Sequence, residues 1–169
     1  FIFKISFENL LNFRVLGLLI LIFSAAFFST HFLKFSLIKK IDDHYFFYFK
    51  IVGIVSIIFY YLENLFTPSY NLLNLSLILL ISGAIFRSFL TDKESRITFL
   101  TISFLYFLLC INKITAGIIM SPFIVFFLFY KFSKIKLITF LLSFVIFSAI
   151  LFFDRNISFV NDYFTSLFL

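Results

Sequence analysis

Long apolar runs separated by short polar or charged segments dominate this chain. A helix that crosses a bilayer needs roughly 20 mostly apolar residues, with a range of about 17 to 25. None of the runs alternates with the period of two that is typical of barrel strands, so each predicts a helix. The pattern indicates an all-α integral membrane protein, a single polytopic domain over residues 1–169, with about six transmembrane helices and short loops. The expected spans are 15–33, 45–62, 65–86, 97–112, 114–130 and 137–153.

The two ends of the chain lack a run of this length. Phe1 to Phe13 and Ile157 to Leu169 mix apolar residues with sparse polar ones, which predicts short interfacial helices along the headgroups or against a partner. Nothing near the start resembles a cleavable signal. Met120 is the single methionine, so we expect either a trimmed beginning or a deviant start codon.

The fourth and fifth runs are separated only by Asn112 and Lys113. This spacing leaves two alternatives open. The two runs form a tight helical hairpin, or residues 97–130 form one broken helix that crosses the membrane once.

The distribution of Lys and Arg supports an even number of spans, because these residues favour the side from which insertion occurs. With six spans, the loops after the first, third and fifth helices lie on one side. That side, with adjacent helix ends, holds Lys34, Lys39, Lys40, Lys50, Arg87, Lys93, Arg96, Lys131, Lys134 and Lys136. The opposite side, which carries both termini, keeps Lys4, Arg14, Lys113 and Arg155.

Composition strengthens the membrane assignment and indicates a compartment. Hydrophobic residues make up 63% of the chain and charged residues 13%, whereas soluble domains have about 45–50% and 25%. The 32 Phe against 4 Gly and 2 Pro favour A- and T-rich codons, as on a mitochondrial genome. In a mitochondrial inner membrane the positive side would be the matrix, with the termini on the intermembrane-space side. Topology therefore explains the net charge of +6, and we expect no nucleic-acid partner.

Motifs for catalysis or cofactor binding are absent from the sequence. Cys110 is the sole cysteine, which excludes an internal disulfide, an iron–sulfur cluster and a thiolate zinc site from this chain alone. His31 and His44 fall at a predicted helix end and in a loop, so they do not suit haem ligation between facing helices. The scattered glycines make no phosphate-binding loop. We therefore predict no catalytic, cofactor-binding or metal-ligating residue.

Ionisable residues within or near the predicted spans are the remaining candidates for chemistry, because they often mark proton or ion routes. The three proton-path candidates are Lys113, Glu63 and Lys50. Lys50 can extend its stem to the headgroups, and Glu63 can be solvated at the end of its span. Lys113 would lie at mid-membrane beside a carboxylate or another lysine in a broken helix, and at the surface in a hairpin.

The stretch from Ile97 to Phe132 resembles the broken twelfth helix of the antiporter-like subunits of respiratory complex I, especially NADH dehydrogenase subunit 2. Ala116, Gly117 and Ile118 match the start of that family's Ala-Gly-Ile-Pro-Pro break. The prolines are replaced by Ile119 and Met120, and the family's lysine position falls near Phe127. A weaker similarity links residues 83–85 (GAI) to a Tyr-Val-Gly-Ala-Ile segment of subunit 6, although close helix packing also explains small residues there.

The resemblance implies a divergent, mitochondrially encoded subunit, whole or split, as in the AT-rich mitochondria of protists such as ciliates. Such a chain would be a membrane-arm subunit of NADH:ubiquinone oxidoreductase. It would support proton translocation or scaffolding, without catalysis or a cofactor of its own. Its expected partners are other membrane subunits of a large hetero-oligomeric complex and bound phospholipid. The alternatives are a structural subunit of ATP synthase or cytochrome c oxidase, and a bacterial polytopic transporter or polysaccharide polymerase fragment.

Overall fold

The described part of the chain is all-helical, as the apolar runs predict. A computed structural model describes residues 10–36, 43–64, 70–90, 96–130 and 134–153. Each predicted span lies mainly on one helix. In these ranges the helices are α2 (Leu10–Ser36), α3 (Asp43–Asn64), α4 (Tyr70–Leu90), α5 (Arg96–Asn112), α6 (Ile114–Tyr130) and α7 (Lys134–Phe153).

The first helix is longer than predicted. α2 has 27 residues and begins at Leu10, so residues 10–13 belong to it rather than to a separate interfacial helix. Arg14 does not interrupt it, because arginine is a good helix former and its long side chain is exposed. Residues 1–9 and 157–169, which hold the rest of the predicted interfacial helices, lie outside the described residues.

Two of the helices are long and apolar enough to cross a membrane. They are residues 14–36 of α2 and residues 71–90 of α4. Shorter apolar helices cover residues 44–59, 96–112, 114–130 and 137–149. At a rise of 1.5 Å per residue, the 17 residues of α6 extend about 25 Å.

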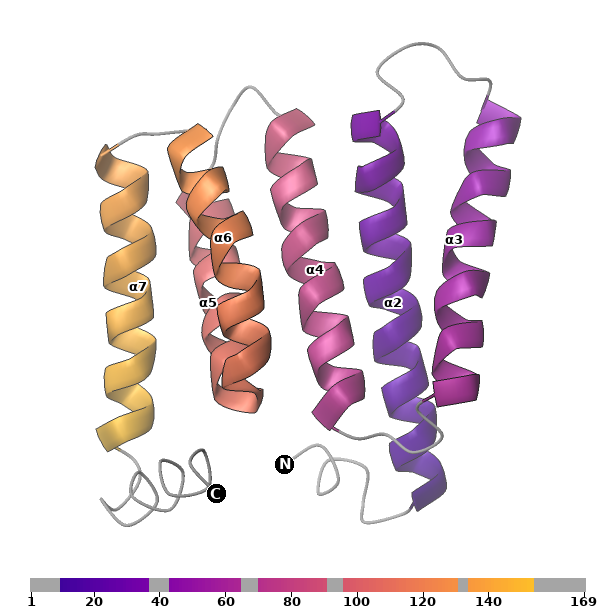
Figure 1. Cartoon of the computed structure of the whole chain (residues 1–169), viewed down its shortest axis with the longest axis horizontal. Helices are drawn as coiled ribbons and strands as arrows, with labels where there is room; N and C mark the ends of the chain where they lie inside the picture. The colour runs from indigo at the N-terminus through magenta and orange to yellow at the C-terminus, as the bar shows by residue number, and fades with distance from the viewer. Residues whose placement is uncertain (1–9, 37–42, 65–69, 91–95, 131–133, 154–169) are drawn as a thin grey trace.

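The helices stand side by side and alternate in direction along the chain (Figure 1). α2 packs against both α3 and α4, and α5 packs against α4, α6 and α7. As a result, α2 and α4 are neighbours that run in the same direction, with α3 on the outer side of α2 (Figure 1). α5 and α7 are a second parallel pair, and α6 lies against α5 and touches α4.

α5 and α6 form a tight antiparallel hairpin, which decides between the two alternatives left open by the sequence. The rings of Phe99 and Phe127 stack with centroids 5.3 Å apart, and the Tyr106 hydroxyl donates to the Gly117 carbonyl at 3.3 Å. These contacts join the start of α5 to the end of α6, and the end of α5 to the start of α6. A single broken helix over residues 97–130 is therefore excluded.

The backbone around Lys113 explains the reversal. Its N–H donates to the Leu109 carbonyl at 2.9 Å, and its own carbonyl accepts from the N–H groups of Ala116 and Gly117. Lys113 is thus the single residue between α5 and α6. Gly117 permits the close return of the chain, since a Cβ there would lie 2.6 Å from the sulfur of Cys110.

The contact between α2 and α4 is equally close at Gly83. A Cβ at this position would lie 2.6 Å from the Phe27 ring and 3.2 Å from the Cα of Phe28. The Cα of Phe28 is a backbone atom, so it cannot relieve the contact by changing rotamer as a side chain can. The absence of a side chain at Gly83 therefore lets the two helices approach each other, as small residues do at helix interfaces in membranes.

The described helices expose far more apolar surface than a soluble protein does. The buried core is mainly apolar but also holds several hydroxyls and one amide, while many of the largest apolar side chains are exposed. Exposed fractions reach 71% for Ile119 and Phe129 on α6, 64% for Tyr48 on α3 and 63% for Val145 on α7. The buried polar residues are Ser24, Ser29, Asn74, Ser76, Ser88, Ser103 and Ser143.

We expect Gly83→Ala to destabilise the fold by about 1–3 kcal/mol, because the added methyl group forces α2 and α4 apart. Thermal unfolding of the purified chain in mild detergent measures this as a lower midpoint. Gly53→Ala is the matched control, since its Cβ would meet only the Ser29 side chain, at 2.9 Å from the hydroxyl oxygen. Equal midpoints for the two variants would contradict the proposed role of Gly83.

Candidate functional site

A cluster of amides and one lysine lies where α4 begins and α5 ends. We call this group, formed by Asn71, Asn74, Asn112 and Lys113, the amide cluster. The Asn112 side-chain nitrogen donates to the Asn74 side-chain oxygen at 2.7 Å. The Lys113 ammonium lies 3.5 Å from the side-chain oxygen of Asn71. Both contacts link the α5–α6 hairpin to α4.

Local sequence explains why these residues meet. Asn71 and Asn74 are in the first two turns of α4, and Asn112 is the last residue of α5. Because α4 and α5 are antiparallel neighbours, the start of one lies beside the end of the other. Asn74 is 5% exposed, and its side-chain nitrogen has no hydrogen-bond partner in the described part of the structure. The hydrogen bond from Asn112 thus satisfies the side-chain oxygen of the buried Asn74. Leaving that oxygen without a partner would cost free energy of folding.

Lys113 occupies the position that the hairpin alternative gives it. Its side chain is exposed at the end of the bundle, at the turn between α5 and α6. It is not halfway along a continuous helix, because the chain reverses direction at this residue. One neighbour of its ammonium is the side-chain oxygen of Asn71, at 3.5 Å.

The other two proton-path candidates lie on α3. Lys50 is half-buried in the second turn of α3, at the end of the bundle opposite the amide cluster. Glu63 is in the last turn of α3, and its side chain lies outside the described part of the structure. Lys50 and Lys113 are thus not brought together. A proton-path role for the three residues stays a prediction.

The two histidines are explained by local structure. His31 lies within α2, more than one turn before its end, with Nδ1 2.8 Å from the Phe27 carbonyl oxygen and its ring 4.5 Å from the Phe27 ring. His44 is in the first turn of α3 rather than in a loop, and is exposed. Among the residues that the structure describes, no three His, Cys, Asp or Glu side chains are placed to hold a metal ion.

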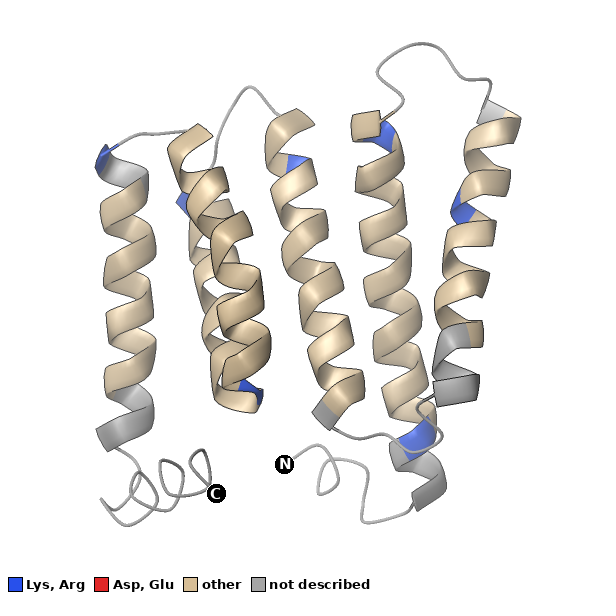
Figure 2. Ribbon diagram, in the orientation of Figure 1, with Lys and Arg blue, Asp and Glu red and all other residues tan. Residues whose placement is uncertain are grey.

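Basic residues gather at the end of the bundle where α2 and α4 finish. Lys34 and Arg87 are in the last turns of these two helices, while Arg96 and Lys134 begin α5 and α7. The ribbon shows their side of the molecule as the more basic one (Figure 2). Of the described basic residues, Arg14 and Lys113 lie toward the other end. Most of the described basic residues therefore lie at one end of the helix bundle, as the charge bias along the sequence predicts.

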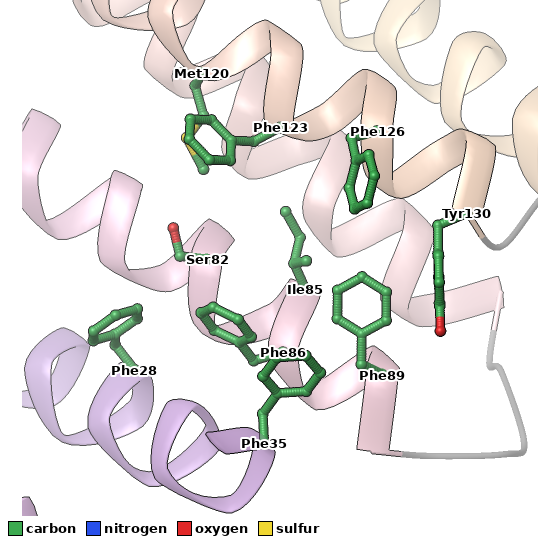
Figure 3. A pocket seen from close by; sticks show the side chains of 10 residues that line it. All are labelled: Phe28, Phe35, Ser82, Ile85, Phe86, Phe89, Met120, Phe123, Phe126 and Tyr130. Carbon is green, nitrogen blue, oxygen red and sulfur yellow. The ribbon is translucent and has the colours of Figure 1, made fainter.

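An apolar groove opens between α2, α4 and α6 (Figure 3). We call it the α2–α4–α6 groove. Its volume is about 550 Å³, and its polar groups are limited to the hydroxyls of Ser82 and Tyr130. Sequence reasoning missed it, because its walls come from three helices whose packing no local pattern reveals. The lining residues are Phe28, Phe35, Ser82, Ile85, Phe86, Phe89, Met120, Phe123, Phe126 and Tyr130.

Comparison with protein-family models, with curated protein sequences and with solved structures finds no match for this chain. Functional reasoning therefore rests on the arrangement of the helices and their side chains.

We expect Asn74 and Asn112 to be energetically coupled. In membrane proteins such interhelical hydrogen bonds average about 0.6 kcal/mol and reach about 1.7 kcal/mol. Asn112→Leu and Asn74→Leu should each destabilise the fold, and the double variant should lose less than the sum of the two. Unfolding by titration with a denaturing detergent measures the four free energies. Strict additivity would show that the 2.7 Å contact contributes nothing to stability.

Proposed function

We propose that this chain is an integral membrane protein with six spans that acts as a scaffold subunit of a larger hetero-oligomeric complex. The observation that carries the proposal is the large apolar surface that the described helices expose. Large apolar residues cover the outer faces of α3, α6 and α7, while serines and an asparagine lie inside. A soluble monomer rarely exposes contiguous apolar surface of more than a few hundred Å². Lipid and apolar partner helices are the surroundings that suit such faces.

The ends of the helices support the same proposal. The described basic residues lie near helix ends. Most of them are at the end of the bundle where α2 and α4 end. This is the asymmetry that membrane insertion produces, with Lys and Arg retained on the side of synthesis. α5 and α6 have 17 residues each, near the lower limit for a span, so their hairpin would place Lys113 near one surface.

A scaffold role is favoured over proton translocation by the geometry around Lys113. In the described ranges, the lysines closest to a possible proton route lie near the ends of helices: Lys50 in the second turn of α3 and Lys113 in a turn. Residues 97–130 form a hairpin rather than a broken helix, so the resemblance to the antiporter-like subunits is limited to the sequence match at Ala116, Gly117 and Ile118. The role that we propose for these helices is therefore to pack against one another. Polar contacts contribute to this packing: the Ser103 hydroxyl donates to the Phe140 carbonyl at 3.0 Å and holds α5 against α7.

For the complex itself, we propose NADH:ubiquinone oxidoreductase of a mitochondrial inner membrane, with both termini in the intermembrane space. The Phe-rich, Gly- and Pro-poor composition supports an AT-rich organelle genome. Partner subunits would cover the exposed apolar faces of α3 and α7 at the two edges of the helix row. No cofactor is assigned to this chain.

Cysteine labelling tests the six-span topology. In a Cys110→Ser background, we expect Lys113→Cys and Lys134→Cys to react with a membrane-impermeant maleimide from opposite sides of sealed vesicles, because α6 separates them. Arg14→Cys should behave as Lys113→Cys does, and Lys34→Cys as Lys134→Cys does. Labelling of Lys113→Cys and Lys134→Cys from the same side would overturn the proposed topology.

A native gel tests the assignment to a complex. Mildly solubilised membranes are resolved, stained for NADH dehydrogenase activity and analysed by mass spectrometry for this chain. Co-migration with the active band is expected. Migration with ATP synthase or cytochrome c oxidase would replace the complex while keeping the scaffold role. Migration as a well-behaved monomer, apart from every respiratory complex, would contradict the proposed function.

A further inference from the structure

α6 is the one described helix that lies outside the row of helices. The other five contact one another in the order α7, α5, α4, α2 and α3, whereas α6 packs on α5 and touches α4 from one side of that row (Figure 1). α6 therefore stands in a second layer. The α2–α4–α6 groove is the space beside it in this layer, with α2 and α4 as its other walls (Figure 3).

The groove and α6 share one property, the lack of ionisable acidic and basic side chains. The residues that line the groove include no Asp, Glu, Lys, Arg or His. Among the six described helices, α6 is the one that contains none of these residues, since each of the others carries at least one Lys or Arg. Charged side chains are costly inside a membrane unless they find partners. The composition of α6 along its whole length therefore suits such a groove.

α6 also presents large apolar side chains to its surroundings. We call Ile119, Phe123, Phe126 and Tyr130 the α6 stripe. Each of them is more than 60% exposed, and they recur at intervals of four, three and four residues. This is the spacing of a seam along which two helices pack at a shallow angle. Phe123, Phe126 and Tyr130 also line the groove, so the stripe is at once the exposed face of α6 and one wall of the groove (Figure 3).

A groove that has a protruding helix as one of its own walls is self-complementary. Rotation by 180° about an axis parallel to the helices brings the α6 of a second copy into the groove and places the first α6 in the groove of the second copy. Such an isologous contact, in which one patch meets its own copy, is the basis of two-fold dimers. An axis along the membrane normal keeps each residue at the same depth in both copies, so the two stripes meet in register.

We propose that the α2–α4–α6 groove receives α6 of a second copy of this chain, and that two copies form a two-fold dimer through their α6 stripes. The inference rests on the proposed membrane location and not on the identity of the complex. The dimer completes the second layer of both copies. It leaves the outer faces of α3 and α7 to other subunits, as the proposed scaffold role requires.

Disulfide cross-linking in native membranes tests the dimer. In the Cys110→Ser background, Phe123→Cys and Phe126→Cys are oxidised with copper phenanthroline, and a product of twice the mass of the chain is expected. Phe59→Cys on α3 and Val145→Cys on α7 are the matched controls, because these side chains are equally exposed but lie at the two edges of the row. The controls should give little of this product. An equal yield from the controls would indicate random collision and overturn the dimer.

A second pair of variants tests the groove as the docking site. Ser82→Leu places bulk in the groove of both copies and should raise the dissociation constant of the dimer about tenfold. Ser56→Leu makes the same change on the exposed face of α3 and should leave the constant unchanged. Energy transfer between labelled chains in lipid vesicles measures both, and the thermal unfolding midpoint verifies that each variant is folded. A folded Ser82→Leu variant with unchanged dimerisation would show that α6 of the second copy does not enter the groove.

A photo-crosslinker at Phe123 separates the dimer from competing occupants of the groove. Capture of a second copy is expected, whereas capture of lipid or of a different subunit in its place would overturn the inference.

The topology assay separates the dimer from the proposed membrane location. If the cysteine labels show the expected sides while no dimer is cross-linked, the dimer is wrong and the membrane location stands. If the labels fail, the membrane topology is wrong, and a dimer about the membrane normal is wrong with it.

Discussion

The close approach of α2 and α4 at Gly83 is the contact on which the rest of the bundle depends. α4 is the central element, because it touches α2 on one side and α5 on the other, and α3, α6 and α7 attach through these helices. On the proposed membrane location, the hydrophobic effect does not drive the helices together, so close van der Waals contact and polar bonds must hold them. The bare backbone at Gly83 allows Phe27 and Phe28 to lie against α4. A bulkier residue there would separate two halves of the molecule.

Within the described ranges, the helices and their approximate positions could be predicted from the sequence, because the length of an apolar run indicates a helix directly. α6 matches its predicted span, and the separation by Asn112 and Lys113 marks a real boundary. The choice between hairpin and broken helix could not be predicted, because it depends on contacts such as Phe99 with Phe127, 28 positions apart in the chain. Hydropathy does not record which runs fold back on each other.

The candidate sites were less accessible to sequence reasoning than the fold. Lys113 was identified as unusual from its apolar surroundings, but its partner Asn71 is distant in the chain and carries no charge to attract attention. The same holds for Asn74, an amide in an apolar run that looks unremarkable until its burial and its bond to Asn112 are seen. The α2–α4–α6 groove had no signal at all, since it arises from space that three packed helices leave between them.

The parallel pairing of α2 with α4, and of α5 with α7, constrains the order in which the chain can assemble. Two successive helices in a membrane run in opposite directions, so a parallel neighbour is always at least two helices away in the sequence. On the proposed membrane location, α2 therefore cannot meet its main partner α4 until α3 has crossed and α4 has entered behind it. On the proposed membrane location, the face of α2 that carries Phe27 and Phe28 must stay in the insertion machinery or in transient contact with lipid during synthesis. The position of α2 and α3 therefore depends on α4, which follows them in the chain. Truncation after α3 would leave these two helices without the surface of α4 against which α2 packs.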